Sequence, residues 1–151
     1  MFFTGHTENQ IDLKQRLAIS AKFRARLAEG GKGTKWFCTP YTKGTLRIYP
    51  QAMFEQLCEP LGTTLAPDPT EEQLLRTLVA NAEEMEMDTT FRVVLPRLQM
   101  TLVGLSREVV VAGMGRWLEV WNKDDWNRDQ QSRLGDLAGL IERFNQPRRT
   151  Q

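Results

Sequence analysis

The sequence predicts an α+β fold with a mainly β core and flanking helices, formed by two tandem copies of one unit. Three observations lead to this prediction: an internal repeat, short apolar runs separated by glycine-containing turns, and helical spacing of apolar residues between them. We expect one compact unit in three parts: a first repeat at 1–60, a linker with a connecting helix at 61–80, and a second repeat with a C-terminal helix at 81–145.

The internal repeat is clearest in residues 11–20 and 87–96, which lie 76 positions apart. Each segment reads as an apolar residue, Asp, three turn residues, Arg and then an apolar run. Residues 46–49 and 118–121 also correspond, at a separation of 72, so the second copy is four residues shorter between these landmarks. Two patterns that recur together indicate a duplicated unit, whereas a single Asp-x-x-x-Arg would indicate nothing.

The first copy is expected to hold strands at 5–11 and 16–19, a helix at 21–27, a hairpin of 35–39 with 45–49, and a helix after Pro50. Phe23 and Leu27 lie four residues apart, on one face of that helix. Gly30 and Gly31 should end the helix, and Gly44 supplies the backbone freedom that the hairpin turn needs.

The second copy repeats this order, with strands at 82–87 and 92–95, a helix that ends near Gly104, a hairpin of 108–112 with 117–121, and a helix after Asn122. The β-branched run at 109–111 indicates a buried strand, and Gly113 and Gly115 lie at the hairpin turn. Asn122 is a candidate N-cap, because Asp124 and Asp125 follow in the first helical turn.

Residues 62–69, rich in Thr and Pro, read as a linker between the copies. A helix should begin directly after it, with Asp68 as N-cap, Pro69 in the first position and Glu71 three residues after the cap. Its apolar residues are expected to bury one face: Leu74, Leu75, Leu78 and Val79.

Composition excludes several classes of protein. No apolar run approaches the ~18 residues that would cross a bilayer, and the start lacks the features of a signal peptide, so we expect a cytoplasmic protein without a membrane partner. Cys38 and Cys58 read as reduced thiols, and with a single His the chain offers no metal site. No catalytic constellation or phosphate loop is visible, so we expect no enzyme activity, cofactor or small-molecule substrate.

Charge is distributed unevenly along the chain. Residues 1–50 carry nine Lys/Arg against three Asp/Glu, whereas residues 51–90 carry one against nine. Residues 91–151 carry ten against seven, and the whole chain has a net charge of +1. This asymmetry suggests that the first copy presents a surface to an anionic partner.

The arrangement resembles the MraZ family across nearly the full length of the chain. The matching stretches are 3–5, 12–17, 23–24, 46–50, 88–96, 104–113, 118–121 and Trp126. The resemblance implies AbrB-like swapped-hairpin repeats that interleave into a small pseudo-twofold barrel, and subunits that close into a ring-shaped homo-oligomer. It also implies a nucleoid-associated transcriptional regulator that binds direct repeats in double-stranded DNA, upstream of division and cell-wall genes.

Departures from the family pattern fall within both turns. The family has Gly directly before the Arg of each motif, where this chain has Gln15 and Phe91. Because Gly adopts positive φ at little cost, the two turns must be either reshaped or strained. The second turn also lacks basic residues, and Gln99 stands where Arg is usual. We therefore expect the first copy to be the DNA surface and the second to be structural.

The candidate DNA-binding residues are Lys14, Gln15, Arg16, Lys22 and Arg24. Lys and Arg neutralise phosphates, and Arg and Gln also read base edges. Asp12 and Asp88 are expected to brace their turns by pairing with the Arg four residues later, so Arg16 either braces its turn, contacts DNA or does both, and Arg92 is assigned to bracing. The helix residues Lys22 and Arg24 fit an ordinary charged surface equally well.

A second hypothesis keeps the fold and changes the function. An oligomeric ring that serves as a scaffold or binds a protein partner, without specific DNA binding, would explain the lost glycines and the neutral second turn. The positive balance of residues 1–50 and the presence of Lys14 and Arg16 favour DNA binding. A gene position beside division genes, with short repeats upstream, would separate the two hypotheses.

Overall fold

The computed structural model describes residues 2–29, 35–63 and 65–147. The first half holds β1 (His6–Gln10), β2 (Arg16–Ala18), α1 (Ala21–Glu29), β3 (Lys35–Thr42), β4 (Thr45–Pro50) and α2 (Gln51–Cys58). Between the halves lie α3 (Pro69–Leu74) and a π-helical turn, η1 (Leu75–Val79). The second half holds β5 (Glu83–Glu86), β6 (Arg92–Val94), α4 (Arg97–Val103), β7 (Glu108–Gly113), β8 (Leu118–Asn122), α5 (Lys123–Gly135) and α6 (Leu137–Asn145).

The fold is α+β, and the predicted strands and helices occur within a few residues of their expected positions. Both hairpins form as predicted, β3 with β4 and β7 with β8. The predicted end of the first helix at Gly30 and Gly31 lies outside the described residues. In the second half, α4 ends at Gly104, which adopts the left-handed conformation (φ 69°) as a C-cap.

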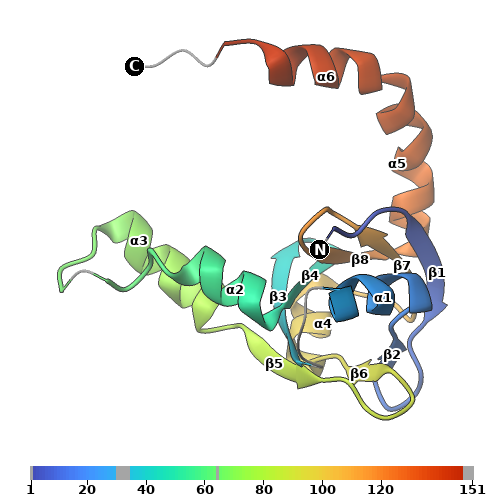
Figure 1. The fold of residues 1–151 in the computed structure, drawn as a ribbon, viewed down its shortest axis with the longest axis horizontal. Coiled ribbons are helices and arrows are strands. Elements are labelled where there is room, and N and C mark those ends of the chain that lie inside the picture. Colours follow the sequence, from blue (N-terminus) through green and yellow to red (C-terminus); the bar gives the residue numbers. More distant parts are fainter. Residues whose placement is uncertain (1, 30–34, 64, 148–151) are drawn as a thin grey trace.

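The strands form an open six-stranded sheet with the order β1-β7-β8-β4-β3-β5, and a separate pair, β2 with β6. The first strand of each half joins the hairpin of the other half, because β1 pairs with β7 and β5 pairs with β3. Figure 1 shows β2 and β6 side by side in the lower part of the molecule. Neither sheet is closed among the described strands, so the barrel expected from the resemblance stays a prediction.

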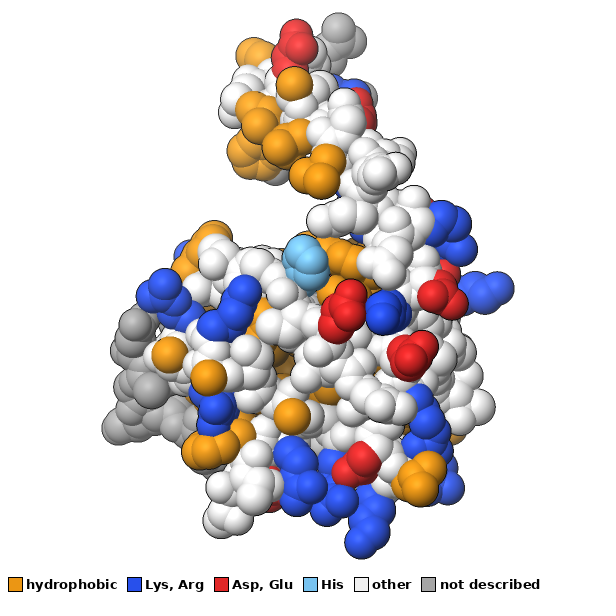
Figure 2. All heavy atoms as spheres, turned by 90° about the vertical axis from the view of Figure 1, so that its right-hand side faces the viewer, with side chains coloured by type: hydrophobic (Ala, Val, Ile, Leu, Met, Phe, Trp, Pro, Cys, Tyr) orange, Lys and Arg blue, Asp and Glu red, His pale blue; other side chains and the backbone are white. Residues whose placement is uncertain are grey.

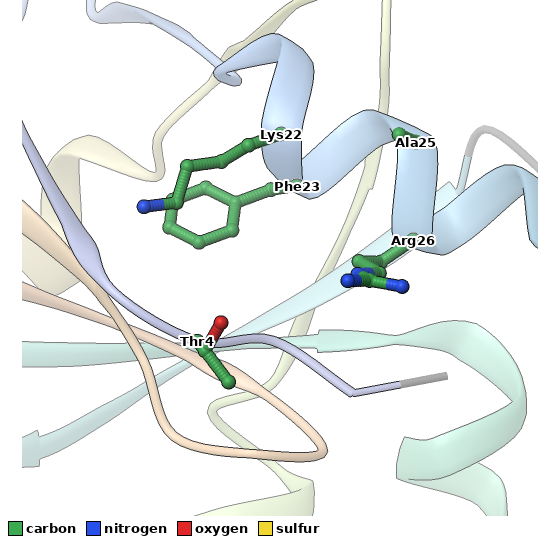
Figure 3. Close-up of a pocket in the computed structure, with 5 residues that line it drawn as sticks. All are labelled: Thr4, Lys22, Phe23, Ala25 and Arg26. Atoms are coloured by element: carbon green, nitrogen blue, oxygen red, sulfur yellow. The ribbon is translucent and has the colours of Figure 1, made fainter.

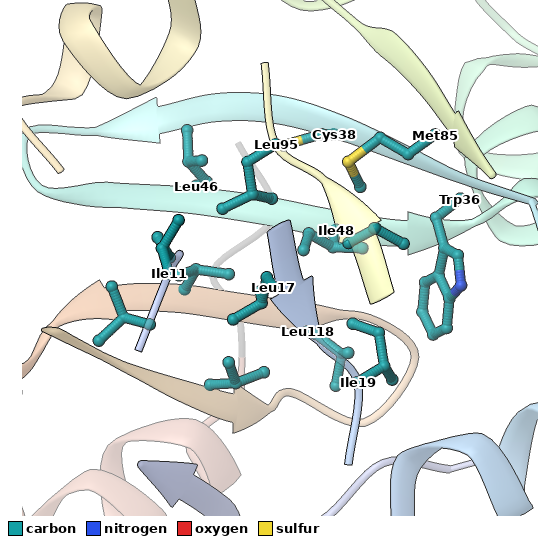
Figure 4. Close-up of a cluster of buried hydrophobic side chains, with 14 of the residues drawn as sticks. Ile11, Leu17, Ile19, Trp36, Cys38, Leu46, Ile48, Met85, Leu95 and Leu118 are labelled. Carbon is teal, nitrogen blue, oxygen red and sulfur yellow. The ribbon is translucent and has the colours of Figure 1, made fainter. Parts of the chain in front are cut away.

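The core lies between the inner face of the large sheet and the β2–β6 pair (Figure 4). Its fully buried side chains come from both halves and include Leu17, Trp36, Leu46, Ile48, Val93 and Leu118. Helices α1 and α4 close its ends through Phe23 and Val103. Burial of this many large apolar side chains, at about 2 kcal/mol each, is the main force that holds the two halves together.

The outer face of the sheet carries one buried ion pair. Arg47 of β4 lies opposite Glu119 of β8, and its Nε donates to the Glu119 carboxylate at 2.9 Å. The aromatic rings of Tyr41 and Trp117 cover the guanidinium at 3.5 and 4.8 Å. Because Glu119 is only 5% exposed, the pair is shielded from water and depends on both partners.

Two predictions about helix ends have different outcomes. Asp68 is the N-cap of α3 as predicted: its carboxylate accepts from the Glu71 backbone N–H at 2.8 Å, and Pro69 takes the first position. Asn122 takes the N-cap position of α5 as predicted, but its side chain makes no cap hydrogen bond. Its amide instead accepts from the Ser106 N–H at 2.6 Å and donates to the Gly104 carbonyl at 2.9 Å, which ties α5 to the turn before β7.

The predicted burial of the connecting helix is wrong within the single chain. Leu74 and Val79 are 44% and 38% exposed, and neither α3 nor η1 contains a buried residue. The C-terminal helix α6 stands away from the sheet in Figure 1 and leaves its own apolar residues exposed. No helix among the described residues is long and apolar enough to cross a membrane.

Candidate nucleic-acid interface

Residues 12–16 form the first turn, which joins β1 to β2. One carboxylate oxygen of Asp12 accepts from the backbone N–H groups of Lys14 and Arg16, both at 2.9 Å. The other accepts from the Nε of Arg16 at 2.6 Å. These bonds lower the pKa of Asp12, and the backbone N–H of Arg16 contributes most. The ionised Asp12 therefore fixes both the backbone of the turn and the direction of the Arg16 side chain.

Residues 88–92 form the second turn with the same arrangement. Asp88 accepts from the backbone N–H groups of Thr90 and Arg92, at 2.8 and 3.0 Å, and from the Nε of Arg92 at 3.2 Å. These bonds, led by the backbone N–H of Arg92, lower the pKa of Asp88 from 3.8 to about 2. Each Asp-x-x-x-Arg motif thus forms a braced turn through local hydrogen bonds.

Both positions at which the resemblance implies glycine have positive φ. Gln15 has φ 60° and Phe91 has φ 64°, and they are the only non-glycine residues with positive φ in the described part of the chain. Of the two alternatives that the sequence left open, strain is therefore the one that the structure shows. Left-handed backbone costs a non-glycine residue about 1 kcal/mol or more, so the rest of the fold must hold both residues there.

The opposite half holds each turn by a backbone hydrogen bond. The carbonyl oxygen of Gln15 accepts from the N–H of Leu95 at 2.8 Å, and that of Phe91 accepts from the N–H of Ile19 at 2.9 Å. Because β2 and β6 pair antiparallel and each turn directly precedes its strand, the two turns lie at opposite ends of the β2–β6 pair, and both are in the lower part of the molecule in Figure 1. The β2–β6 pair lies between them.

An arginine of the opposite half covers the tip of each turn. Arg97 is the first residue of α4, and its Nη2 donates to Oε1 of the Gln15 side chain at 2.8 Å. The guanidinium carbon of Arg24, on α1, lies 3.7 Å from the centroid of the Phe91 ring. The two strained residues are therefore contacted through both their backbone and their side chains.

The structure separates the five predicted DNA-binding residues into three places. Lys14, Gln15 and Arg16 lie together in the first turn, with Lys14 exposed and Arg16 paired with Asp12. Arg24 lies at the second turn, where its guanidinium carbon is 3.7 Å from the centroid of the Phe91 ring. The exposed Lys22 lines a separate hollow with Thr4 and Arg26 (Figure 3), where its ammonium lies 5.4 Å from the Phe23 ring centroid.

Two arginines of the second half contact the first turn, and the sequence did not predict either contact. Arg107 donates to the backbone carbonyl of Asp12 at 2.9 Å, and Arg97 contacts Gln15. Gln15, Arg97 and Arg107 line one hollow beside the turn. The sequence separations of 82 and 95 residues leave no local pattern that could have found these contacts.

The charge of this surface is largely unneutralised. Within the described ranges, Lys14, Arg97 and Arg107 form no ion pair with a carboxylate, whereas Arg16 is paired with Asp12. Figure 2 shows Lys and Arg side chains gathered at the lower end of the molecule, where the turns of Figure 1 lie. A positive surface with donors from Lys, Arg and Gln suits the phosphates and base edges of a nucleic acid.

Gln99, which stands where the family has Arg, is buried and structural. Its side-chain amide donates to the carbonyl oxygens of Cys38 and Asn81, at 2.9 and 2.6 Å. Only 2% of the residue is exposed, so it does not reach the surface formed by the turns. This position ties α4 to β3 and to the start of the second half.

Comparison with known proteins gives consistent matches along the chain. The family model "MraZ protein, putative antitoxin-like" matches twice, over residues 2–77 and 78–137. The "Transcriptional regulator MraZ" of Nitrosospira multiformis is 33% identical over 138 residues, which cover 91% of this chain and 93% of that protein. The protein of the same name from Herpetosiphon aurantiacus is 31% identical over 140 residues, covering 93% and 94%. That from Corynebacterium kroppenstedtii is 34% identical over 130 residues, covering 86% and 87%.

Proposed function

Because the chain belongs to the MraZ family, we propose that it is a transcriptional regulator that binds double-stranded DNA sequence-specifically through the first turn. The observation that carries this proposal is the braced turn of residues 12–16. There Asp12 fixes Arg16, while Lys14 is exposed and has no carboxylate partner among the described residues. The turn presents a phosphate-binding lysine beside the base-reading types Gln and Arg.

The DNA target that we propose is a set of short direct repeats upstream of division and cell-wall genes. A single turn is a small contact that binds weakly by itself. Several identical turns in one assembly would engage successive repeats, and each engagement raises the effective concentration for the next. Such a protein would act in the cytoplasm, associated with the nucleoid, and no catalytic step is part of this proposal.

We propose that the assembly is a ring-shaped homo-oligomer. The exposed apolar side chains of α3, η1 and α6 support self-association: Leu74, Val79, Leu137, Leu140, Ile141 and Phe144. Apolar helix faces of this extent need cover, and a second copy of the same chain can supply it through a heterologous contact that closes on itself.

For the chain itself we propose two AbrB-like swapped-hairpin repeats, 1–60 and 81–145, joined by 61–80 and wrapped into a small pseudo-twofold barrel. The strand order supports this proposal, because it is symmetric about the β8–β4 contact and exchanges β1 and β5 between the halves. The β2–β6 pair crosses the open side of the large sheet (Figure 1).

The scaffold hypothesis is the second candidate, and Phe91 favours it. This side chain is 46% exposed at the tip of a turn that also contains the neutral Thr89 and Thr90. An apolar tip suits a protein partner better than a phosphate.

One binding experiment separates the two candidates. The purified full chain is titrated with duplex DNA that carries direct repeats from its own upstream region, and with a scrambled duplex, over a salt series. We expect preference for the repeats and an affinity that falls steeply with salt. Equal, weak binding of both duplexes by a folded oligomer would favour the scaffold.

A further inference from the structure

We infer that Arg97 and Arg24 extend the DNA contact across both halves, each acting at the turn of the half to which it does not belong. Arg97 orients the Gln15 amide at the first turn, and Arg24 gives the second turn a positive charge at its tip. This inference rests on the proposed function and assigns further residues to it. It also makes the second turn part of the DNA surface, which the sequence analysis had expected to be structural.

Arg97 fixes the side chain of Gln15. The backbone of Gln15 is already held at φ 60° by the Leu95 N–H, which bonds its carbonyl oxygen at 2.8 Å. With the side-chain oxygen held by Arg97 at 2.8 Å, the amide NH2 group remains to donate to acceptors on a base edge or a phosphate. A glutamine held at both ends loses less conformational entropy on binding than a free one.

Arg97 also contributes its own charge. It is exposed, and within the described residues its guanidinium has no carboxylate partner. It begins α4 directly after Pro96, whose fixed φ of −64° sets where the helix starts relative to the first turn. Guanidinium N–H groups that are not used on Gln15 can therefore meet a phosphate beside the turn.

Arg24 is held by the aromatic face of Phe91. Its guanidinium carbon lies 3.7 Å from the ring centroid, and its Nε is buried without a hydrogen-bond partner among the described residues. Stacking therefore positions this group, as the planar guanidinium favours. Thr89 and Thr90 are neutral and Arg92 is paired with Asp88, so Arg24 supplies the unpaired charge at this tip.

The two replaced glycines thus have related consequences. Gln15 and Phe91 each add a side chain at the tip of a turn, and each side chain holds an arginine from the opposite half. The tips lie at opposite ends of the antiparallel β2–β6 pair, and both are in the lower part of the molecule in Figure 1. Duplex DNA, with one charge per about 1.7 Å of its axis, would then meet positive groups at both turns.

The test uses Arg97→Met and Arg24→Met in the full chain, with Arg116→Met, at an exposed position in the β7–β8 turn, as the control. Binding to the repeat duplex and to the scrambled duplex is measured over a salt series, and folding is checked by melting temperature. We expect each variant to bind the repeats about tenfold more weakly, since a specific contact is worth ~1–3 kcal/mol. The slope of log affinity against log salt should fall by about 0.9 for each lost phosphate contact.

The partner residues give an independent check. Gln15→Ala should lower the preference for the repeats, and Arg97→Met should cost less in that background if it acts through Gln15. Phe91→Leu keeps the apolar bulk and removes the aromatic face, so it should reproduce the change in salt slope of Arg24→Met. These two variants test the same contacts if either Met variant fails to fold.

Two different results would count against two different claims. If the wild type shows no preference for the repeats, the proposed function fails and this inference fails with it. If the wild type prefers the repeats, but all four variants keep its affinity, preference and salt slope, the inference alone is wrong.

Discussion

The guanidinium of Arg24 stacks on the ring of Phe91, with 3.7 Å between its carbon and the ring centroid, so α1 of the first half contacts the second turn. The first turn has a corresponding contact, from Arg97 to Gln15. Gln15 and Phe91 stand where the resemblance implies glycine, and both have the positive φ that glycine adopts at little cost. The backbone is therefore strained at the tips of both turns, and the side chain at each tip contacts an arginine of the opposite half.

Replacing Gln15 by Gly should stabilise the protein. Gly removes the strain at φ 60°, and the expected gain in free energy of unfolding is about 1 kcal/mol. Chemical unfolding measures this change. Leu13→Gly is the control, because Leu13 is 81% exposed in the same turn and does not have positive φ; it should not stabilise the protein. A Gln15→Gly variant less stable than wild type would show that the Arg97 contact outweighs the strain.

Removing the carboxylate of Glu119 should destabilise the fold severely. Glu119→Ala leaves the partly buried Arg47 guanidinium, whose side chain is only 18% exposed, without its carboxylate partner, and loss of about 3 kcal/mol in free energy of unfolding is expected. The exposed pair of Lys35 and Glu84 offers a control, since Glu84→Ala should cost less than about 1 kcal/mol. Equal losses of stability in the two variants would contradict the claim that the Arg47–Glu119 pair is shielded from water.

Stability should fall in acid as the two turns lose their braces. The folded state lowers the pKa of Asp88 from 3.8 to about 2 and also lowers that of Asp12. A lowered pKa stabilises the fold fully above the unfolded value, and this contribution disappears as the pH falls from about 4 through 2. The free energy of unfolding, determined at several pH values between 5 and 2, measures this contribution. The double variant Asp12→Asn, Asp88→Asn should lose less stability over this range than wild type, and a parallel pH profile would contradict the assignment.

The exposed face of α6 should be needed for self-association. Ile141 and Phe144 are 52% and 78% exposed, and replacing both by Asp places charges on that face. Sedimentation should then show smaller assemblies than the wild type forms. Leu65→Asp, at a fully exposed position of the linker, is the control and should assemble as wild type does. Unchanged assembly of the α6 variant would exclude this helix from the interface.

Local patterns explain what could be predicted from the sequence. The Asp-x-x-x-Arg turns form through hydrogen bonds within five residues, and the hairpins and the cap at Asp68 depend on neighbours in the chain. Contacts between distant segments could not be predicted in this way. The Asn122 side chain bonds across to Gly104 instead of capping its own helix, and Arg97 reaches Gln15 over 82 residues. Whether a helix face is covered depends on contacts that its own residues do not encode, so the exposure of Leu74 could not be predicted.

The most direct measurement is the affinity of the full chain for its own upstream repeats against scrambled DNA, for wild type and Lys14→Glu. Lys14 is exposed and makes no side-chain contact that holds the turn, so its charge can be reversed without removing the Asp12 brace. Arg116→Glu, also a charge reversal but in the β7–β8 turn, is the matched control, and Arg16→Glu removes the second cation of the first turn. Our account predicts that wild type and the control prefer the repeats, and that both turn variants lose this preference. Undiminished preference in Lys14→Glu and Arg16→Glu would contradict the placement of the DNA contact on the first turn.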